Sequence, residues 1–547
     1  MHRALTIAFL LLIYLSPALQ AQTFATAPEK PKLILYIIVE QMRQDYLPRF
    51  QDKLGAGGFR RLQEQGFWCR DARYTSALNQ SAPAHATLAT GVYPSFHGIV
   101  SDYWYNRTSR KWEDAVADEK ESTVGGSYEA GRVSPRQLTA TTLGDELRLN
   151  TRKLSLIYSI AWDAAPAVLS AGHHANGAFW IDEQTGNWVT STFYKEIPLA
   201  FLQSYNLRQI PASHASRTWM TRFPTHTYAT CWPDLNAYEK GFGGRTTFPY
   251  NLQEMLRNKS LTDKMGTLRA TPFANTIIKD MAVALLEREP LGKDGYTDML
   301  TITFSGTEHI GRLFGPQSIE MEDAFLWLDQ DLEQLFASVD AQVGMENTLV
   351  VLTATHGMAT PPAYTGEDSN AAGYFNTNSA ISLLRSYLNA LYGEGDWLTG
   401  YRNRQGYLNR ELIEKSGKSF EAVAQTAAAF LSEFSGVSSA ITSKQLAEYP
   451  AGGLLIQQRN SFHPLRSGDI LVTLAPGWTE KTERVSESDS PYPYDVRVPL
   501  FWMGWKIPRG THGEPVDLTD VATTVAEMLH IQAPGAASGK ILLPLLP

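Results

Sequence analysis

Residues 74–99 read YTSALNQSAPAHATLATGVYPSFHGI, and this stretch decides how the rest of the chain is interpreted. Ser81 stands in a loop broken by proline, just ahead of a helix-compatible run, Ala84–Thr90. Gly91 ends that run, as glycine commonly does at a helix C-terminus. Backbone N–H groups and the helix dipole favour an anion at a helix N-terminus, so a hydroxyl there can attack a phosphate or sulfate ester. The alternative is that Ser81 only caps the helix.

Three apolar runs indicate the strands of a buried parallel sheet. Residues 33–39 are continuously apolar and rich in β-branched side chains, which is typical of a strand buried on both faces. Residues 298–305 and 348–354 follow the same pattern, and the helical spacing of 318–343 between them predicts a right-handed strand–helix–strand crossover. Glu40 follows the first run, at the edge where open α/β sheets place their sites.

The remaining segments complete one large α/β domain, which we predict to span residues 22–547. Residues 495–503 indicate a further strand, and residues 517–529 indicate a capped helix near the C-terminus. Two intervening segments, about 160–290 and about 361–490, lack a clear alternation of strands and helices. We expect them to be insertions that form a cap over the C-terminal edge of the sheet.

The composition is that of an ordinary globular protein, and it argues against some partners. The chain has 547 residues, of which 43% are hydrophobic and 19% charged, and its net charge is −8. This balance gives no reason to expect nucleic acid or an anionic membrane surface as a partner. Cys69 and Cys231 are too few for a zinc site or a disulfide framework, and they either pair with each other or remain separate buried thiols.

The N-terminus predicts export. Residues 1–21 combine a basic start, a short apolar run and a small residue at its exit, which is the pattern of a secretory signal peptide cleaved near Ala21. The run is short for a transmembrane span, and no other stretch of about 20 apolar residues occurs, so we expect no stable membrane span. We therefore expect a periplasmic or extracellular protein.

Residues 74–99 resemble the nucleophile loop of the alkaline phosphatase superfamily, in which a Thr, Ser or Cys precedes a helix that ends in TG…P…HG. The resemblance runs along most of the mature chain. It is closest to the periplasmic single-chain alkaline phosphatases with a Thr nucleophile, which are type I phosphodiesterase/nucleotide pyrophosphatase-like. It implies an α/β fold, a three-layer sandwich with a mostly parallel central sheet and cap insertions. It also implies zinc-dependent hydrolysis of phosphate esters, with Ser81 as the nucleophile.

The resemblance also identifies the positions that hold two metal ions in the family. In this chain they carry Glu40, Ser81, Glu308, Arg312, Thr355, His356 and a residue of 486–490, which we align as Ser488 with Asp489 as the neighbouring alternative. Only His356 keeps the family's residue. Three others keep its chemical class, namely Glu40, Ser81 and Glu308. These four residues are the ligands expected if any metal binds, and we expect at most one divalent ion in place of the family's zinc pair.

Arg312 is the decisive departure from the family pattern. A guanidinium stays protonated in proteins and has no lone pair to donate, so it cannot bind a metal ion. It can instead pair with Glu308 or Glu40 and neutralise carboxylates that a metal ion would otherwise hold. Asp102 stands where the family has an Asn that binds a phosphoryl oxygen, and residues 159–165 lack the family's Lys-x-Arg pair.

The sequence leaves three functions open. The first is a secreted phosphatase-fold protein that no longer builds the two-metal site, is catalytically weak or inactive, and has a binding or regulatory role. The second is an active phosphodiesterase or phosphatase with a rebuilt or single-metal site, whose candidate catalytic residues are Ser81, Arg312 and Asp102. The third is a sulfatase-like hydrolase, because residues 81–85 resemble the sulfatase C/S-x-P-x-R loop with His85 in place of its Arg. In each case the expected ligand is a small phosphate or sulfate ester.

Overall fold

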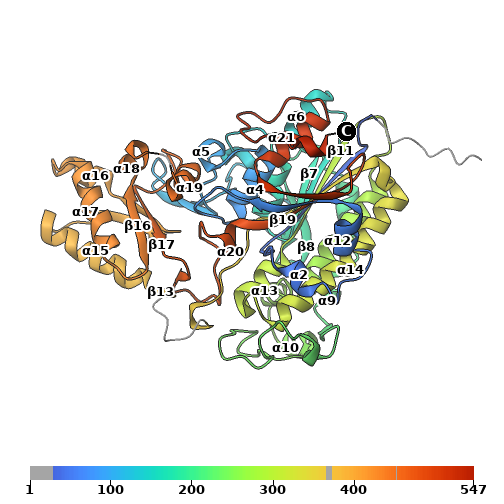
Figure 1. Ribbon diagram of the computed structural model, residues 1–547, viewed down its shortest axis with the longest axis horizontal. Helices are drawn as coiled ribbons and strands as arrows, with labels where there is room; N and C mark the ends of the chain where they lie inside the picture. The colour runs from blue at the N-terminus through green and yellow to red at the C-terminus, as the bar shows by residue number, and fades with distance from the viewer. Residues whose placement is uncertain (1–28, 365–371, 451, 547) are drawn as a thin grey trace, which may run out of the picture.

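A ten-stranded sheet forms the centre of the computed structural model, which describes residues 29–364, 372–450 and 452–546 (Figure 1). Its strands are, in spatial order, β20 (Gly510–Asp517), β2 (Phe67–Arg73), β19 (Arg497–Gly504), β12 (Thr348–Ala354), β1 (Leu33–Val39), β11 (Asp298–Phe304), β6 (Ile157–Ile160), β7 (Gly177–Asp182), β8 (Asn187–Ser191) and β5 (Thr123–Val124). The predicted signal peptide, residues 1–21, lies outside the described residues.

Most neighbouring strands of this sheet run parallel. β1 lies between β11 and β12 and pairs with both in parallel, and the pairs β11–β6, β6–β7 and β2–β20 are parallel too. β19 runs antiparallel to both β12 and β2, and β8 runs antiparallel to β7 and β5. All residues of β1 are buried, which agrees with a central strand covered on both faces. The predicted mostly parallel sheet is confirmed.

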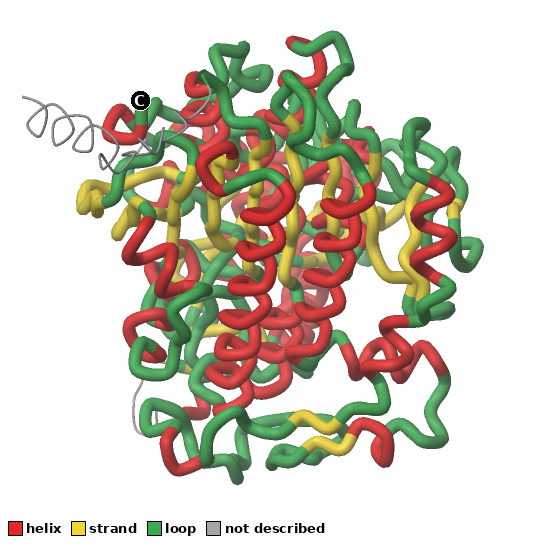
Figure 2. The backbone as a smooth tube through the Cα atoms, turned by 90° about the vertical axis from the view of Figure 1, so that its right-hand side faces the viewer, coloured by secondary structure: helices red, strands yellow, loops and turns green. Residues whose placement is uncertain are grey.

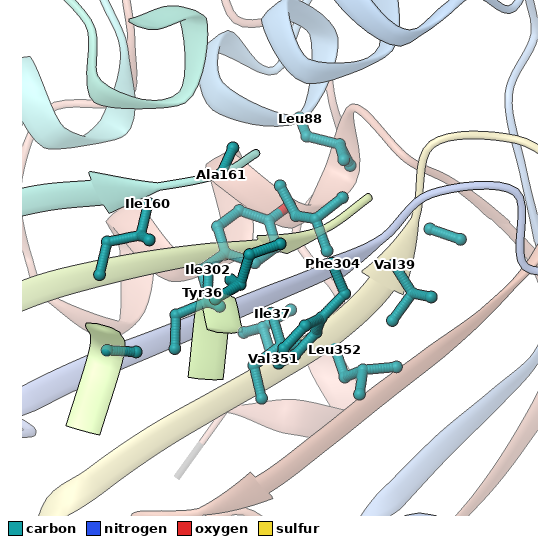
Figure 3. Packing of buried hydrophobic residues seen from close by; sticks show 14 of the residues in the cluster. Tyr36, Ile37, Val39, Leu88, Ile160, Ala161, Ile302, Phe304, Val351 and Leu352 are labelled. Carbon is teal, nitrogen blue, oxygen red and sulfur yellow. The ribbon is translucent and has the colours of Figure 1, made fainter. Parts of the chain in front are cut away.

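Helices cover both faces of the sheet and complete the predicted three-layer sandwich (Figures 1 and 2). One layer contains α4 (Ser81–Thr90), α6 (Leu143–Asn150), α7 (Ala164–Ala171) and α21 (Asp520–Met528). The other contains α2 (Tyr46–Phe50), α3 (Phe59–Gln65), α12 (Pro272–Arg288), α13 (Gly306–Phe314) and α14 (Ile319–Gln342). Figure 3 shows side chains of β1, β6, β11 and β12 packed together, with Leu88 of α4 above them. The helices predicted over 318–343 and 517–529 correspond to α14 and α21.

A smaller unit lies beside the sandwich and has an apolar core of its own (Figure 1, orange). Its sheet has the order β14 (Leu398–Arg402), β15 (Gln405–Leu408), β17 (Ile470–Leu474) and β16 (Val437–Thr442), and its helices are α15 (Thr377–Tyr392), α16 (Arg410–Lys415) and α17 (Phe420–Ser432). This unit falls within the second predicted insertion. The first predicted insertion contains β7 and β8 of the central sheet, and α12. The division into one domain with two insertions stays a prediction.

Short elements connect these layers. They are α5 (Pro94–His97), β3 (Tyr103–Asn106), β4 (Lys111–Asp114), α8 (Leu199–Asn206), α9 (Ile210–His214), β9 (Thr218–Trp219), β10 (Tyr250–Asn251), α10 (Leu252–Met255), α11 (Leu261–Leu268), β13 (Gly373–Phe375), α18 (Ser443–Glu448), α19 (Leu454–Ser461), β18 (Trp478–Glu480) and α20 (Pro493–Val496). Cys69 and Cys231 are both free thiols. Among the helices of the described ranges, none has the length and apolar character needed to cross a membrane.

Candidate active site

The ends of three parallel strands meet at one edge of the central sheet. Val39 of β1 lies opposite Phe304 of β11 and Ala354 of β12 in the strand register. Glu40 and Thr355 therefore leave the sheet at the same level, and α13 begins shortly after β11. The candidate ligands from three separate parts of the sequence are brought to one edge because parallel strands share their carboxyl-terminal side.

Ser81 is the first residue of α4, and its hydroxyl is directed at Glu40. The sequence places the start of the helix at Ala84, but the helix begins earlier because Pro83 fits the first turn, where its missing N–H is not needed. Gln80 is the N-cap residue and makes no side-chain capping hydrogen bond. Ser81 Oγ donates a hydrogen bond to Glu40 Oε1. The candidate nucleophile is thus joined directly to a candidate metal-binding carboxyl group.

Glu40 is fully buried among other ionisable groups. Its Oε1 atom accepts the Ser81 hydrogen bond and lies 3.4 Å from His85 Nε2, whereas its Oε2 atom has no hydrogen-bond partner among the described residues. Burial and the negative charge of Glu308 raise the pKa of Glu40 to about 8. Burial also lowers the pKa of His85 to about 3, so its imidazole is neutral. A carboxyl group that keeps its proton near neutral pH needs no cation to balance it.

Arg312 forms an ion pair with Glu308 one helical turn away on α13. The Arg312 Nη2 atom donates to Glu308 Oε1. Glu308 is 4% exposed, and burial alone would raise its pKa, but the Arg312 guanidinium and His356 lower the pKa of Glu308 below its usual value. Burial would lower the pKa of Arg312, but Glu308 and Asp102 raise it, so Arg312 stays charged. The guanidinium therefore pairs with Glu308, one of the two partners expected for it, and neutralises this carboxylate.

His356 and Thr355 follow β12 and are both fully buried. His356 Nδ1 lies 2.9 Å from the carbonyl oxygen of Gly357, so this nitrogen carries the hydrogen and donates it. His356 Nε2 lies 3.9 Å from Glu308 Oε1 and has no hydrogen-bond partner in the part of the chain that the structure describes. Thr355 Oγ1 has no partner there either. The pocket thus contains buried polar atoms of Glu40, His356 and Thr355 without a hydrogen-bond partner among the described residues.

Asp102 lies at the N-terminus of α4. Its Oδ1 atom accepts a hydrogen bond of 2.8 Å from the backbone N–H of Ala82, the residue after the candidate nucleophile. The Asp102 backbone N–H donates in turn to Gln80 Oε1 at 3.0 Å. Desolvation by the surrounding protein raises the pKa of Asp102 to about 7, although the Ala82 hydrogen bond favours the charged form. The contact therefore holds a candidate catalytic residue against the start of the helix that carries Ser81.

The loop of residues 485–490 lies beside Arg312. The Val485 backbone N–H donates to the carbonyl oxygen of Arg312 at 2.9 Å. Gln80 Nε2 donates to Asp489 Oδ2 at 3.3 Å, and Ser488 is 8% exposed. The loop therefore connects α13 to the start of α4. Ser488 and Asp489 are the two residues aligned with the family's last metal-binding position, and the choice between them stays a prediction.

The structure adds an ion pair that the sequence did not single out. His309 Nε2 lies 3.1 Å from Asp163 Oδ2. Desolvation would raise the pKa of Asp163, but His309 lowers it to about 2. His309 is the neighbour of Glu308, and Asp163 lies in the segment that lacks the family's basic pair. The only sequence signal was this proximity to predicted site residues, because the two partners are far apart along the chain.

The residues present do not fit a two-metal centre. Within residues 29–364, 372–450 and 452–546, no group of three or more His, Cys, Asp or Glu side chains is arranged to hold a metal ion. Glu308 is already paired with Arg312, a cation that cannot act as a metal ligand. Glu40 Oε2, His356 Nε2 and Thr355 Oγ1 are buried and have no hydrogen-bond partner among the described residues.

Comparison with known proteins shows similarity along nearly the whole chain. Residues 34–498 match the model of the type I phosphodiesterase / nucleotide pyrophosphatase family. The chain is 32% identical over 537 residues to alkaline phosphatase PafA of Elizabethkingia meningoseptica, covering 96% of both chains. It is 30% identical over 537 residues to alkaline phosphatase PhoV of Synechococcus elongatus, covering 96% of this chain and 95% of PhoV.

Solved structures agree with these similarities. The crystal structure of wild-type PafA superimposes with a TM-score of 0.89 at 31% identity, and the match covers 95% of this chain and 99% of PafA. Murine ectonucleotide pyrophosphatase/phosphodiesterase 5 superimposes with a TM-score of 0.52 at 14% identity, over 93% of this chain and 97% of the murine chain, which shows a shared fold alone. The predicted alkaline-phosphatase-like architecture is therefore confirmed.

Proposed function

Since the chain belongs to the type I phosphodiesterase / nucleotide pyrophosphatase family within the alkaline phosphatase superfamily, we propose that it is a member without the two-metal centre. In this proposal it is catalytically weak or inactive towards phosphate esters and has a binding or regulatory role. The family is hydrolytic and metal-dependent, so the proposal concerns what this member has lost. A small phosphate or sulfate ester is the ligand class that the retained fold and the position of Ser81 favour.

The ion pair between Arg312 and Glu308 carries this proposal. Removing a metal ion from a site of buried carboxylates would leave uncompensated negative charge, which costs several kcal/mol per ion. Here a permanent cation lies on the carboxylate, and the second carboxyl group, Glu40, holds a proton near neutral pH. The pocket is therefore neutralised by its own side chains. A zinc ion bound to Glu308 would have to displace the Arg312 guanidinium, which does not lose its charge.

Zinc content and turnover test the proposal. The native protein, purified with zinc present, should contain fewer than two zinc ions per chain by elemental analysis and should hydrolyse aryl phosphate mono- and diesters slowly or not at all. Arg312→His restores an imidazole and should raise zinc uptake, whereas Arg385→His, at an exposed ion pair, should leave it unchanged. Two tightly bound zinc ions with fast turnover in the native protein, or unchanged zinc content in Arg312→His, would contradict the proposal.

A second candidate function rests on the buried atoms Glu40 Oε2 and His356 Nε2, which have no hydrogen-bond partner among the described residues. Together with Ser81 they favour at most one divalent ion, and the protein would then be a hydrolase with a single-metal site. Ser81 would attack phosphorus in line, and Arg312 would stabilise the negative charge of the phosphoryl oxygens. One zinc ion per chain combined with turnover that Ser81→Ala abolishes would support this candidate over the first.

The sulfatase-like activity and the export of the protein both remain predictions. Among the residues that the structure describes, no contact favours the sulfatase-like alternative. This alternative requires a formylglycine at residue 81 and is tested by mass spectrometry of the peptide that contains Ser81. Export to the periplasm or beyond is proposed from residues 1–21 and is tested by N-terminal sequencing of the mature protein, which should begin near residue 22.

A further inference from the structure

The N-terminus of α4 has few free donors to offer a ligand beside Ser81. Pro83 has no N–H, and the Ala84 N–H is bonded to the carbonyl oxygen of Gln80 at 3.1 Å. The first turn of the helix therefore keeps only the N–H groups of Ser81 and Ala82 for a bound anion. The number of donors is set by the sequence SAP at the helix start.

One of these two N–H groups already donates a hydrogen bond to a side chain of the protein. Asp102 Oδ1 accepts the Ala82 N–H at 2.8 Å. This contact persists in either protonation state, because a carboxyl oxygen accepts a hydrogen bond with or without its proton. A second contact, from the Asp102 backbone N–H to Gln80 Oε1, fixes the backbone of this residue against the helix start. The Asp102 carboxyl group therefore takes a donor that an anion bound at this helix start would otherwise use.

The charges around Ser81 also disfavour a doubly charged ligand. Glu40 contacts the Ser81 hydroxyl, and Asp102 contacts the next residue. Arg312 is the nearby cation, but its guanidinium is bound to Glu308. A phosphate dianion would thus meet the Asp102 carboxyl group in place of the Ala82 N–H, and a cation that is already paired. A diester carries one negative charge and two esterified oxygens, so it meets less repulsion and needs fewer N–H donors.

We propose that Asp102 is a specificity-determining residue that occupies the anion-binding N-terminus of α4 and excludes phosphate monoesters and free phosphate, while singly charged diesters are tolerated. This inference rests on the proposed function, because it describes a pocket without two metal ions. It assigns to one side chain the choice between two ligand classes of the same superfamily.

The test measures binding of inorganic phosphate and of dimethyl phosphate by isothermal titration calorimetry, in alkaline buffer after removal of metal ions with EDTA. The variants are Asp102→Asn, which removes the charge and keeps an acceptor for Ala82, and Asp102→Ala, which also frees the N–H. Asp114→Asn is the matched control, because Asp114 accepts the Val116 N–H at 3.0 Å in the same hairpin, away from Ser81. Thermal melts confirm that each variant folds, and Asp102→Asn decides the test if Asp102→Ala does not.

Inorganic phosphate should bind at least about tenfold more tightly to the Asp102 variants than to the native protein, a change of about 1.4 kcal/mol. Dimethyl phosphate should gain less than about threefold, and Asp114→Asn should bind both probes as the native protein does. Equal phosphate affinity in the native protein and both Asp102 variants would overturn the inference, as would an equal gain for both probes. Zinc content and ester turnover of the native protein, measured on the same sample, decide the proposed function separately.

Discussion

Removal of the Arg312 guanidinium should leave Glu308 as an uncompensated buried carboxylate. Two unit charges about 4 Å apart interact by about 4 kcal/mol at an effective dielectric of about 20. Removing one partner of a buried ion pair typically costs about 3–5 kcal/mol. The Arg312 side chain is 24% exposed, so water screens part of the interaction. We therefore expect Arg312→Met, which keeps the apolar stem of the side chain, to destabilise the protein by about 3 kcal/mol.

A double-mutant cycle with Glu308→Gln isolates the ion pair from other effects of substitution. The double variant should recover most of the lost stability, because neither an unpaired carboxylate nor an unpaired guanidinium remains. The coupling energy should be about 2 kcal/mol, read from urea unfolding and from a shift of about 2 °C in Tm for a chain of this length. Arg385→Met removes an exposed ion pair whose side chains are 39% and 63% accessible, and should cost at most about 1 kcal/mol.

Two results would refute the predicted role of Arg312. If Arg312→Met costs no more than Arg385→Met, or if the coupling energy with Glu308→Gln is near zero, then Arg312 does not neutralise Glu308. A bound cation would then have to balance this carboxylate, and the expected consequence is a loss of stability in the native protein on treatment with EDTA.

Two further predictions concern stability outside this ion pair. Asp145 holds the pKa of His173 above its usual value against the effect of burial, and His173 holds the pKa of Asp145 low, so His173→Gln should destabilise the protein most between about pH 4 and about 6.5. The loss should shrink above this window, where His173 releases its proton, and below it, where Asp145 gains one; thermal melts that show a constant loss would contradict this. Gly357→Ala should cost about 2 kcal/mol, because the new Cβ would lie 2.0 Å from the carbonyl oxygen of Tyr494. Gly295→Ala, with open space around it, should be nearly neutral in the same urea titration, and equal costs would refute the clash.

The sequence predicted the central elements because their burial is uniform along the chain. Residues 33–39 and 348–354 form β1 and β12 with the predicted bounds, since a continuous apolar run has one stable place, between two helix layers. The long helix over 318–343 forms α14 for a similar reason, because its apolar face repeats at the helical period. The start of α4 at Ser81 was missed, since proline is compatible both with a loop and with a first helical turn.

The sequence by itself determined that Glu40 and Thr355 would meet at one sheet edge, because residues after parallel strands share that edge. It also determined that Arg312 could not bind a metal ion, because a guanidinium has no free lone pair. The tertiary structure alone decided which partners these groups take. The hydrogen bond from the Ala82 N–H to Asp102 depends on how a hairpin crosses a helix N-terminus. The pair of His309 with Asp163 joins segments that are far apart along the chain. Local patterns encode burial and chemical type, whereas distances between remote side chains are fixed only when all layers pack together.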